Sequence, residues 1–212
     1  MRCCMCGIEL GESSLRDILI GEDQLCLECR QSWLHIPQHF SVNGVRADSD
    51  YIYYSGFSSC LIQYKECGDE ALKDVFLYAV KRKLKRRYRG WTLCLMPSTQ
   101  EKENIRGFGH LRAMYAQLGI ETMEPFEKQS SLAQKEQDYY GRQKMRDAIV
   151  LKKGMILPKK IVLCDDVITT GATLKGALQC IDLKIHQVRI YTAAADSRDR
   201  ILKKGEEWLN FK

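Results

Sequence analysis

The sequence predicts an α/β protein with a central, mostly parallel sheet flanked by helices, preceded by a small N-terminal zinc ribbon. Two observations lead to this fold class. A short apolar run rich in β-branched residues, Ile161 to Cys164, is followed by a polar loop and then by apolar residues at helical spacing. That order is typical of a buried parallel strand that leads into a helix. Near the N-terminus, two C-x2-C pairs have the spacing of a four-cysteine zinc site.

The N-terminal cysteines are candidate metal ligands. The expected zinc ligands are Cys3, Cys6, Cys26 and Cys29. Four thiolates close a tetrahedral Zn2+ site and leave no position for a catalytic water, so we expect a structural centre. Cys4 lies between the first two ligands and could replace Cys3. His35 and His39 are substitute ligands, although a surface or core role is the simpler explanation for each.

Composition indicates a globular protein that handles phosphate-bearing ligands. Of the 212 residues, 45% are hydrophobic and 28% charged, and the net charge is +6. We expect a zinc ribbon at 1-45 and an α/β domain at 46-212, with a linker over 41–50. No apolar run reaches the length of a membrane span and no signal-peptide pattern follows Met1, so we expect a cytoplasmic protein. Its ten cysteines then indicate metal ligands or buried thiols.

Between the ribbon and the central strand we expect several smaller elements. A strand at 51–54 and a short helical turn around Leu61 precede an amphipathic helix whose apolar face runs from Leu72 to Leu84. The end of that helix carries the basic run Lys81 to Arg89. A basic run favours a helix C-terminus, and it is either a solvated face or a grip for a polyanion.

A second buried strand is expected at 91–96 and ends at Pro97 and Ser98. If it runs parallel to the central strand, its loop faces the same edge of the sheet as Asp165 and Asp166. A turn of sequence Arg-Gly-Phe-Gly at 106–109 then opens a helix.

The rest of the chain is expected to contain a flap, a helix and a strand. The polar stretch 127–147 is interpreted as the flap. After the central strand we expect a helix to about residue 183, a strand at 186–194 and a short docking helix in 196–212.

The stretch from Asp165 to Thr173 has the chemistry of a ribose 5-phosphate site. Ionised carboxylates only accept hydrogen bonds, so Asp165 and Asp166 suit the two hydroxyls of a ribose. Unpaired N–H groups at the start of the next helix attract an anion, and Gly171 lets the backbone approach it closely. The residues expected to hold the phosphate are Thr169, Thr170, Gly171, Ala172 and Thr173. A simple helix cap or a solvated acidic pair explains only part of this order, and a Walker loop is excluded because no Gly-Lys-Ser/Thr occurs.

Residues 161–173 closely resemble the phosphoribosyl pyrophosphate (PRPP) motif of type I phosphoribosyltransferases. Together with the ribbon and several smaller motifs, the chain resembles the ComF family nearly end to end. Those motifs are Lys65, Gly68-Asp69, Pro97-Ser98, Arg106-Gly107-Phe108, and Gln134 eight residues before Arg142. Gly109 and Met145 depart from the family pattern, since the family often has asparagine at both positions.

The resemblance implies a type I phosphoribosyltransferase fold and a competence function, the uptake of DNA in natural transformation. The expected partner is the helicase-like ATPase ComFA, which acts in the import of single-stranded DNA. The implied reaction is a Mg2+-dependent displacement of pyrophosphate from PRPP by an acceptor that the sequence does not identify. Pro97 and Ser98 would meet the pyrophosphate. Lys65, Arg106 and Arg142 would stabilise its developing charge, beside the catalytic pair Asp165 and Asp166.

The alternative is a non-catalytic adaptor. In that case the zinc ribbon and the basic helix would contact single-stranded DNA and ComFA, and PRPP would be at most a ligand.

Overall fold

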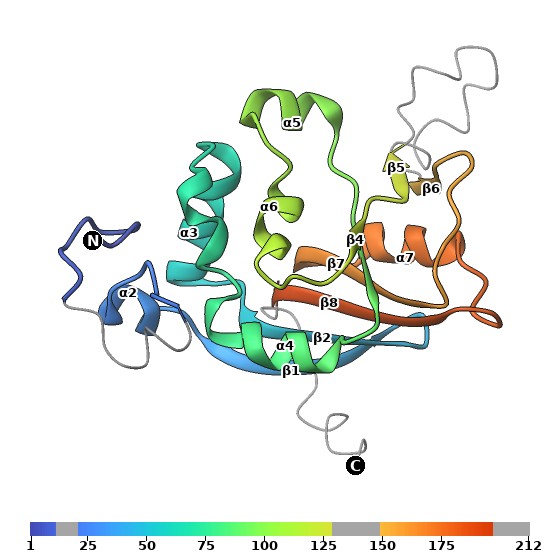
Figure 1. Ribbon diagram of the computed structural model, residues 1–212, viewed down its shortest axis with the longest axis horizontal. Helices are drawn as coiled ribbons and strands as arrows, with labels where there is room; N and C mark the ends of the chain where they lie inside the picture. Colours follow the sequence, from blue (N-terminus) through green and yellow to red (C-terminus); the bar gives the residue numbers. More distant parts are fainter. Residues whose placement is uncertain (12–20, 129–148, 197–212) are drawn as a thin grey trace.

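The computed structural model describes residues 1–11, 21–128 and 149–196 (Figure 1). Within them lies a six-stranded sheet in the order β1-β2-β8-β7-β3-β4. Only β1 and β2 pair antiparallel; the other neighbouring strands are parallel. Its strands are β1 (His35–Val42), β2 (Val45–Ile52), β3 (Thr92–Leu95), β4 (Thr122–Met123), β7 (Lys160–Ile168) and β8 (Gln187–Ala195). The predicted α/β class with a mostly parallel sheet is confirmed.

Helices and a small hairpin surround this sheet. Figure 1 draws α3, α5, α6 and α7 above the strands and α4 in front of β1 and β2. The α-helices are α2 (Leu27–Gln31), α3 (Ser55–Glu66), α4 (Lys81–Arg87), α5 (Gln100–Arg106), α6 (His110–Ala116) and α7 (Ala172–Gln179). Two 3-10 helices, η1 (Glu70–Asp74) and η2 (Tyr78–Val80), lie between α3 and α4. Strands β5 (Phe126–Lys128) and β6 (Ile149–Leu151) form a separate antiparallel pair. None of the described helices combines the length and the apolar character needed to cross a membrane.

Strand β7 occupies an inner position of the sheet, as its apolar sequence predicts. Ile161 to Cys164 are completely buried, with β8 on one side and β3 on the other. Leu95 of β3 is in register with Cys164, and the N–H of Met96 donates to the Cys164 carbonyl at 2.9 Å. The predicted parallel arrangement of the two strands is therefore confirmed. It places the ends of β3 and β7 at the same edge of the sheet.

Several expectations about local structure are wrong. Residues 41–50 are not a linker, because they belong to the β1–β2 hairpin, which turns at Asn43 and Gly44 with φ values of 48° and 81°. Two residues with positive φ are what a two-residue hairpin turn requires. The sheet therefore includes residues on both sides of the expected domain boundary. Strand β7 continues to Ile168, so the aspartates lie within it rather than after its end.

The expected long helix over 72–84 is replaced by η1, η2 and the short α4. Its apolar residues are nevertheless buried, except Ala79, because the irregular path still turns Leu72, Phe76 and Leu84 inward. Conversely, the short turn expected near Leu61 is the twelve-residue α3.

Other differences concern the second half of the chain. Helix α5 precedes the Arg-Gly-Phe-Gly turn, and α7 ends at Gln179 rather than near residue 183. Most of the proposed flap, including Gln134 and Arg142, lies outside the described residues, as does the proposed C-terminal helix after Asp196.

The N-terminal segment packs against the rest of the protein through Trp33 and Arg30. The Trp33 ring is buried and lies 4.9 Å from Phe57 and 5.7 Å from Phe76, between ring centroids. Arg30 pairs with Asp23 and donates from Nη1 to the Val75 carbonyl at 3.0 Å. The loop that precedes α2 is thereby joined to η1 and α3.

Candidate sugar-phosphate and metal sites

Asp166 is a buried carboxylate held by side chains from two helices. Its Oδ2 lies 2.6 Å from Nζ of Lys65, at the end of α3, and 3.0 Å from Nε2 of His110, at the start of α6. Its Oδ1 accepts the Val167 N–H at 2.7 Å. Burying a carboxylate costs free energy unless it is paired and hydrogen-bonded, and here both conditions are met.

Asp165 has a different environment although it is the next residue. It is half-buried, and its Oδ1 accepts the Asp166 N–H at 2.9 Å. Its backbone carbonyl accepts the Tyr115 hydroxyl at 2.8 Å. Among the described residues, no cation lies within ion-pair distance of its carboxylate. Asp165 is therefore the member of the pair whose carboxylate remains available to a ligand.

The two carboxyl groups have opposite pKa shifts. Burial and the charge of Asp166 raise the pKa of Asp165 to about 7. Burial alone would raise the pKa of Asp166 too, but the hydrogen bond from His110 and the charge of Lys65 hold it well below its ordinary value. Burial opposes the charge of Lys65 as well, yet the carboxylates raise its pKa above the ordinary value. Lys65 and Asp166 consequently form a charged pair at neutral pH.

The loop after β7 has the conformation needed for close approach to an anion. Gly171 adopts φ 69° and is the N-cap of α7, while Thr169 and Thr170 are exposed. The Ala172 N–H donates to Oγ1 of Thr170 at 3.3 Å. Leu174, Ala177 and Leu178 fix the helix against the core. The start of α7 therefore lies a few residues beyond the carboxylates, with Thr173 in its first turn.

The structure brings most of the remaining predicted site residues to this edge. Pro97 and Ser98 follow β3 and are half-buried. Arg106 does not contact Asp166 directly, because its Nε donates to the Lys65 carbonyl at 2.7 Å and its Nη1 lies 2.9 Å from Nδ1 of His110. Arg142 lies outside the described residues.

Sequence reasoning missed His110. The residue is buried, and its contact with Asp166 joins positions 56 residues apart. The only sequence sign was a histidine directly after the Arg-Gly-Phe-Gly turn, which does not by itself indicate a site.

Part of the basic run serves the fold. Lys83 pairs with the buried Asp50, and Arg87 lies 2.7 Å from the buried Asp48, both on β2. The hydroxyl of Tyr191 also donates to Asp50, at 3.0 Å. The exposed cations of the run include Lys85, Arg86 and Arg89.

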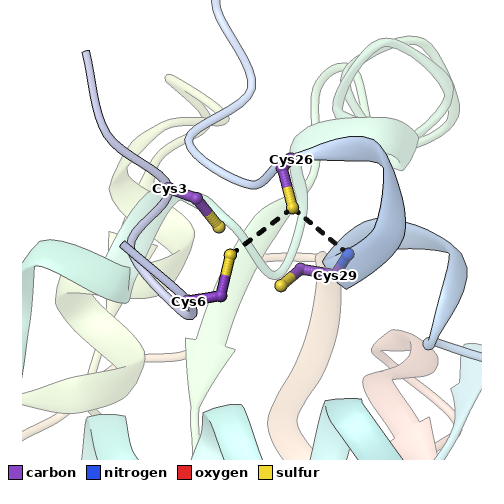
Figure 2. A group of neighbouring side chains, drawn as sticks. All are labelled: Cys3, Cys6, Cys26 and Cys29. Carbon is purple, nitrogen blue, oxygen red and sulfur yellow. Dashed lines mark hydrogen bonds between the residues drawn. The ribbon is translucent and has the colours of Figure 1, made fainter. Parts of the chain in front are cut away.

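The four cysteines predicted as zinc ligands lie close together. Their sulfur atoms are all within 4.8 Å of one another, and those of Cys6 and Cys26 are 3.7 Å apart. A tetrahedral zinc site with bonds of about 2.3 Å separates its sulfurs by about 3.8 Å, so the donor set fits zinc. Figure 2 shows the side chains converging from the N-terminal loop and from the start of α2. Backbone N–H donors contribute as well, since that of Cys29 lies 3.5 Å from Sγ of Cys26.

The other proposed ligands are not part of this cluster. Cys4 directs its thiol to Oε1 of Gln24 at 4.0 Å. His35 and His39 lie on β1 and face Asp50 and Asp48. Burial alone would raise the pKa of the Cys3 thiol, but hydrogen bonds from backbone groups of Cys26, Cys6 and Met5 lower it to about 6. Because Cys3 lies in the cluster of four sulfurs and Cys4 points to Gln24, Cys3 is the better candidate ligand of the two.

Removing one cluster cysteine should release the metal. We expect wild-type protein to contain about one zinc per chain and Cys6→Ser to contain much less, with a clear loss of thermal stability, because zinc binding contributes folding free energy. Atomic absorption and thermal unfolding measure both. Cys4→Ser is the matched control and should retain the metal; equal zinc loss in the two variants would contradict this ligand set.

The aspartates should respond in opposite ways to neutralisation. The pKa of Asp165 is raised in the folded state, so the folded protein binds more protons than the unfolded chain between about pH 4 and 7, and this group lowers stability as pH rises. At pH 8, Asp165→Asn should therefore stabilise the protein by about 1 kcal/mol, a small value because the residue is only partly buried. The gain should vanish at pH 4.

Asp166→Asn is the matched comparison and should destabilise the protein by about 3 kcal/mol, because it leaves Lys65 without its partner. Chemical denaturation at the two pH values measures both variants. Stabilisation by Asp166→Asn would show that the roles of the two carboxylates are reversed.

The chain is similar to a competence protein over most of its length. No family model matches the chain. Over 207 residues it is 25% identical to "Competence protein ComFC" of Streptococcus pneumoniae (strain ATCC BAA-255 / R6), and the match covers 86% of this chain and 94% of that protein. The resemblance to the ComF family is thereby confirmed: this chain is a homologue of ComFC over most of both sequences.

Proposed function

We propose that this protein is a competence protein that binds PRPP and acts as a phosphoribosyltransferase in DNA uptake. The similarity to ComFC supports the competence role. The observation that carries the biochemical part is the unequal carboxylate pair. Asp166 is fixed by Lys65 and His110, whereas Asp165 is left for a ligand at the edge of the sheet.

The neighbouring groups suit the two ends of a phosphorylated ribose. The Asp165 carboxylate can accept hydrogen bonds from ribose hydroxyls. The loop from Thr169 to Thr173 offers threonine hydroxyls and the N–H groups of the first turn of α7, which suit the 5-phosphate. An open α/β sheet commonly binds its ligand at this edge, beyond the carboxyl ends of the strands.

The diphosphate of PRPP would lie toward Pro97 and Ser98 at the end of β3. Mg2+ would accompany it, since this ion prefers phosphate oxygens and retained waters to a complete protein cage. Lys65 supplies positive charge beside the pair, and 27% of its side chain is exposed. The roles proposed for Arg106 and Arg142 rest on the resemblance alone.

The four-cysteine cluster is proposed to hold a structural Zn2+ that orders the N-terminal segment. In the cell, the protein would work with ComFA on the import of single-stranded DNA, on the cytoplasmic side and at the inner face of the membrane. The cellular location and the partner are proposed from the similarity to ComFC.

A second candidate function is a non-catalytic adaptor for single-stranded DNA and ComFA. It is favoured by the exposed cations Lys85 and Arg86 on α4 and Arg89 just after it; Lys83 and Arg87 anchor this helix to β2. A fixed row of cations neutralises phosphates without regard to sequence.

PRPP binding tests the first proposal. In calorimetric titration with PRPP and Mg2+, the wild type should bind and Asp165→Asn should lose at least tenfold in affinity. The substitution replaces one of two acceptor oxygens by an NH2 group, which can only donate. Glu9→Gln makes the same charge change on the exposed N-terminal loop and should bind normally. A folded, zinc-loaded wild type that binds no PRPP would contradict the proposal.

DNA binding tests the second. Reversing charge in Lys85→Glu with Arg86→Glu should weaken binding of a single-stranded oligonucleotide at least tenfold and reduce the slope of affinity against salt concentration. Exchange of the exposed Lys184, which is not part of the basic run, for Glu is the control. Unchanged affinity and slope in the double variant would exclude this surface as a DNA contact.

A further inference from the structure

A chain of hydrogen bonds connects Arg106 to the carboxylate pair through His110. Nη1 of Arg106 lies 2.9 Å from Nδ1 of the imidazole, and Nε2 of the same ring lies 3.0 Å from Oδ2 of Asp166. The histidine is only 6% exposed. Both of its ring nitrogens are therefore occupied by protein groups, and neither is available to take a proton from a ligand.

The partners determine which nitrogen of His110 carries the proton. A guanidinium group has donors only and does not lose its proton in proteins, so Nδ1 has to be the acceptor. The proton then resides on Nε2 and points at Asp166, which is an acceptor because its carboxyl is ionised. Arg106 thus sets the tautomer that lets His110 donate to the carboxylate.

The backbone around His110 and Lys65 is held by further hydrogen bonds. The backbone carbonyl of His110 accepts the Tyr64 hydroxyl at 2.6 Å. Arg106 also donates from Nε to the backbone carbonyl of Lys65 at 2.7 Å, so one guanidinium joins α3 to α6. Arg106 therefore contacts the imidazole of His110 and the backbone of Lys65, the two residues whose side chains meet Oδ2 of Asp166.

These contacts leave Asp166 little freedom as an acceptor. A carboxylate offers about four lone-pair positions. Lys65 and His110 occupy two on Oδ2, and the Val167 N–H occupies one on Oδ1. One acceptor position remains, and its direction is fixed by the other three bonds.

We propose that His110 is a positioning residue that acts through Asp166. By donating from Nε2, it fixes the plane of this carboxylate and with it the Asp166 N–H, which holds Oδ1 of Asp165 at 2.9 Å. The Asp165 carboxylate is thereby oriented to meet the ribose hydroxyls. This inference rests on the proposed function of the site. It assigns His110 no contact with the ligand and no role as a general base.

Glutamine and leucine in place of His110 differ in the hydrogen bonds that they can make. A glutamine at this position has one amide oxygen to accept from Arg106 and one N–H group to donate to Asp166, so it reproduces both bonds of the imidazole. A leucine fills a similar volume and makes neither bond. A role limited to filling space would be served by leucine at least as well as by glutamine.

The experiment is calorimetric titration of PRPP with Mg2+ into the wild type, His110→Gln and His110→Leu. We expect His110→Gln to bind within about threefold of the wild type and His110→Leu to bind at least tenfold more weakly, the loss typical of one hydrogen bond to a charged group. Wild-type affinity in His110→Leu, or equal losses in the two variants, would overturn the proposal. Zinc content and thermal unfolding establish that each variant is folded.

Arg106→Leu provides a second, independent test, and it replaces His110→Leu if that variant does not fold. It keeps the histidine but removes the donor to Nδ1, so affinity should fall severalfold. The double variant Arg106→Leu, His110→Leu should be no weaker than His110→Leu alone, because the two residues act in one chain. Additive losses would show that Arg106 acts on the ligand by another route and would contradict the relay.

Failure of the proposed function can be told apart from failure of this inference. If the folded wild type binds no PRPP, the proposed function is wrong. The hydrogen-bond chain from Arg106 through His110 to Asp166 is then tested by the 15N resonances of the His110 ring. A ring protonated on Nε2 in the wild type, and altered in Arg106→Leu, supports the chain from Arg106 to Asp166. A ring protonated on Nδ1, or on both nitrogens, overturns it.

Discussion

The candidate site depends on the pair between Lys65 and Asp166. Two adjacent carboxylates within a buried strand repel each other, and burial penalises their charges further. Lys65 and His110 offset this cost for Asp166 only, at 2.6 Å and 3.0 Å from the same oxygen. The remaining cost falls on Asp165, whose pKa is raised to about 7. One carboxylate is thereby part of the scaffold, and the other keeps a raised pKa at some expense in stability.

The same constraint applies to β2, which is separated from β7 by β8. Asp48 and Asp50 on β2 are buried and are met by Arg87 and Lys83 from α4. Two residues of the basic run therefore have a structural role, because they neutralise carboxylates that are buried on β2. The same helix carries the exposed cations Lys85 and Arg86. A single element thus stabilises the fold and forms a surface suited to phosphate groups.

The parts of the fold that depend on local sequence were predictable. Strand β7, the loop at Gly171 and the parallel partner β3 follow from apolar runs and their flanking residues, and the four clustered cysteines follow from spacing. The hairpin at Asn43 and Gly44 carried a recognisable turn dipeptide that was assigned to a linker instead. The prediction of one helix over 72–84 was wrong, because its apolar residues are buried by two 3-10 helices and a short α-helix instead. His110 could not be found, since its role exists only through contacts that the folded chain creates.

The most direct test of this account is the titration of the two carboxyl groups by 13C NMR, with Asp165→Asn and Asp166→Asn to assign the signals. The account predicts that the Asp166 signal stays that of an ionised carboxylate through the acidic range in which the protein remains folded. The Asp165 signal should titrate near pH 7. Two carboxyl groups that both titrate near pH 4, or an Asp166 that titrates near pH 7, would contradict the unequal pair on which the proposed site rests.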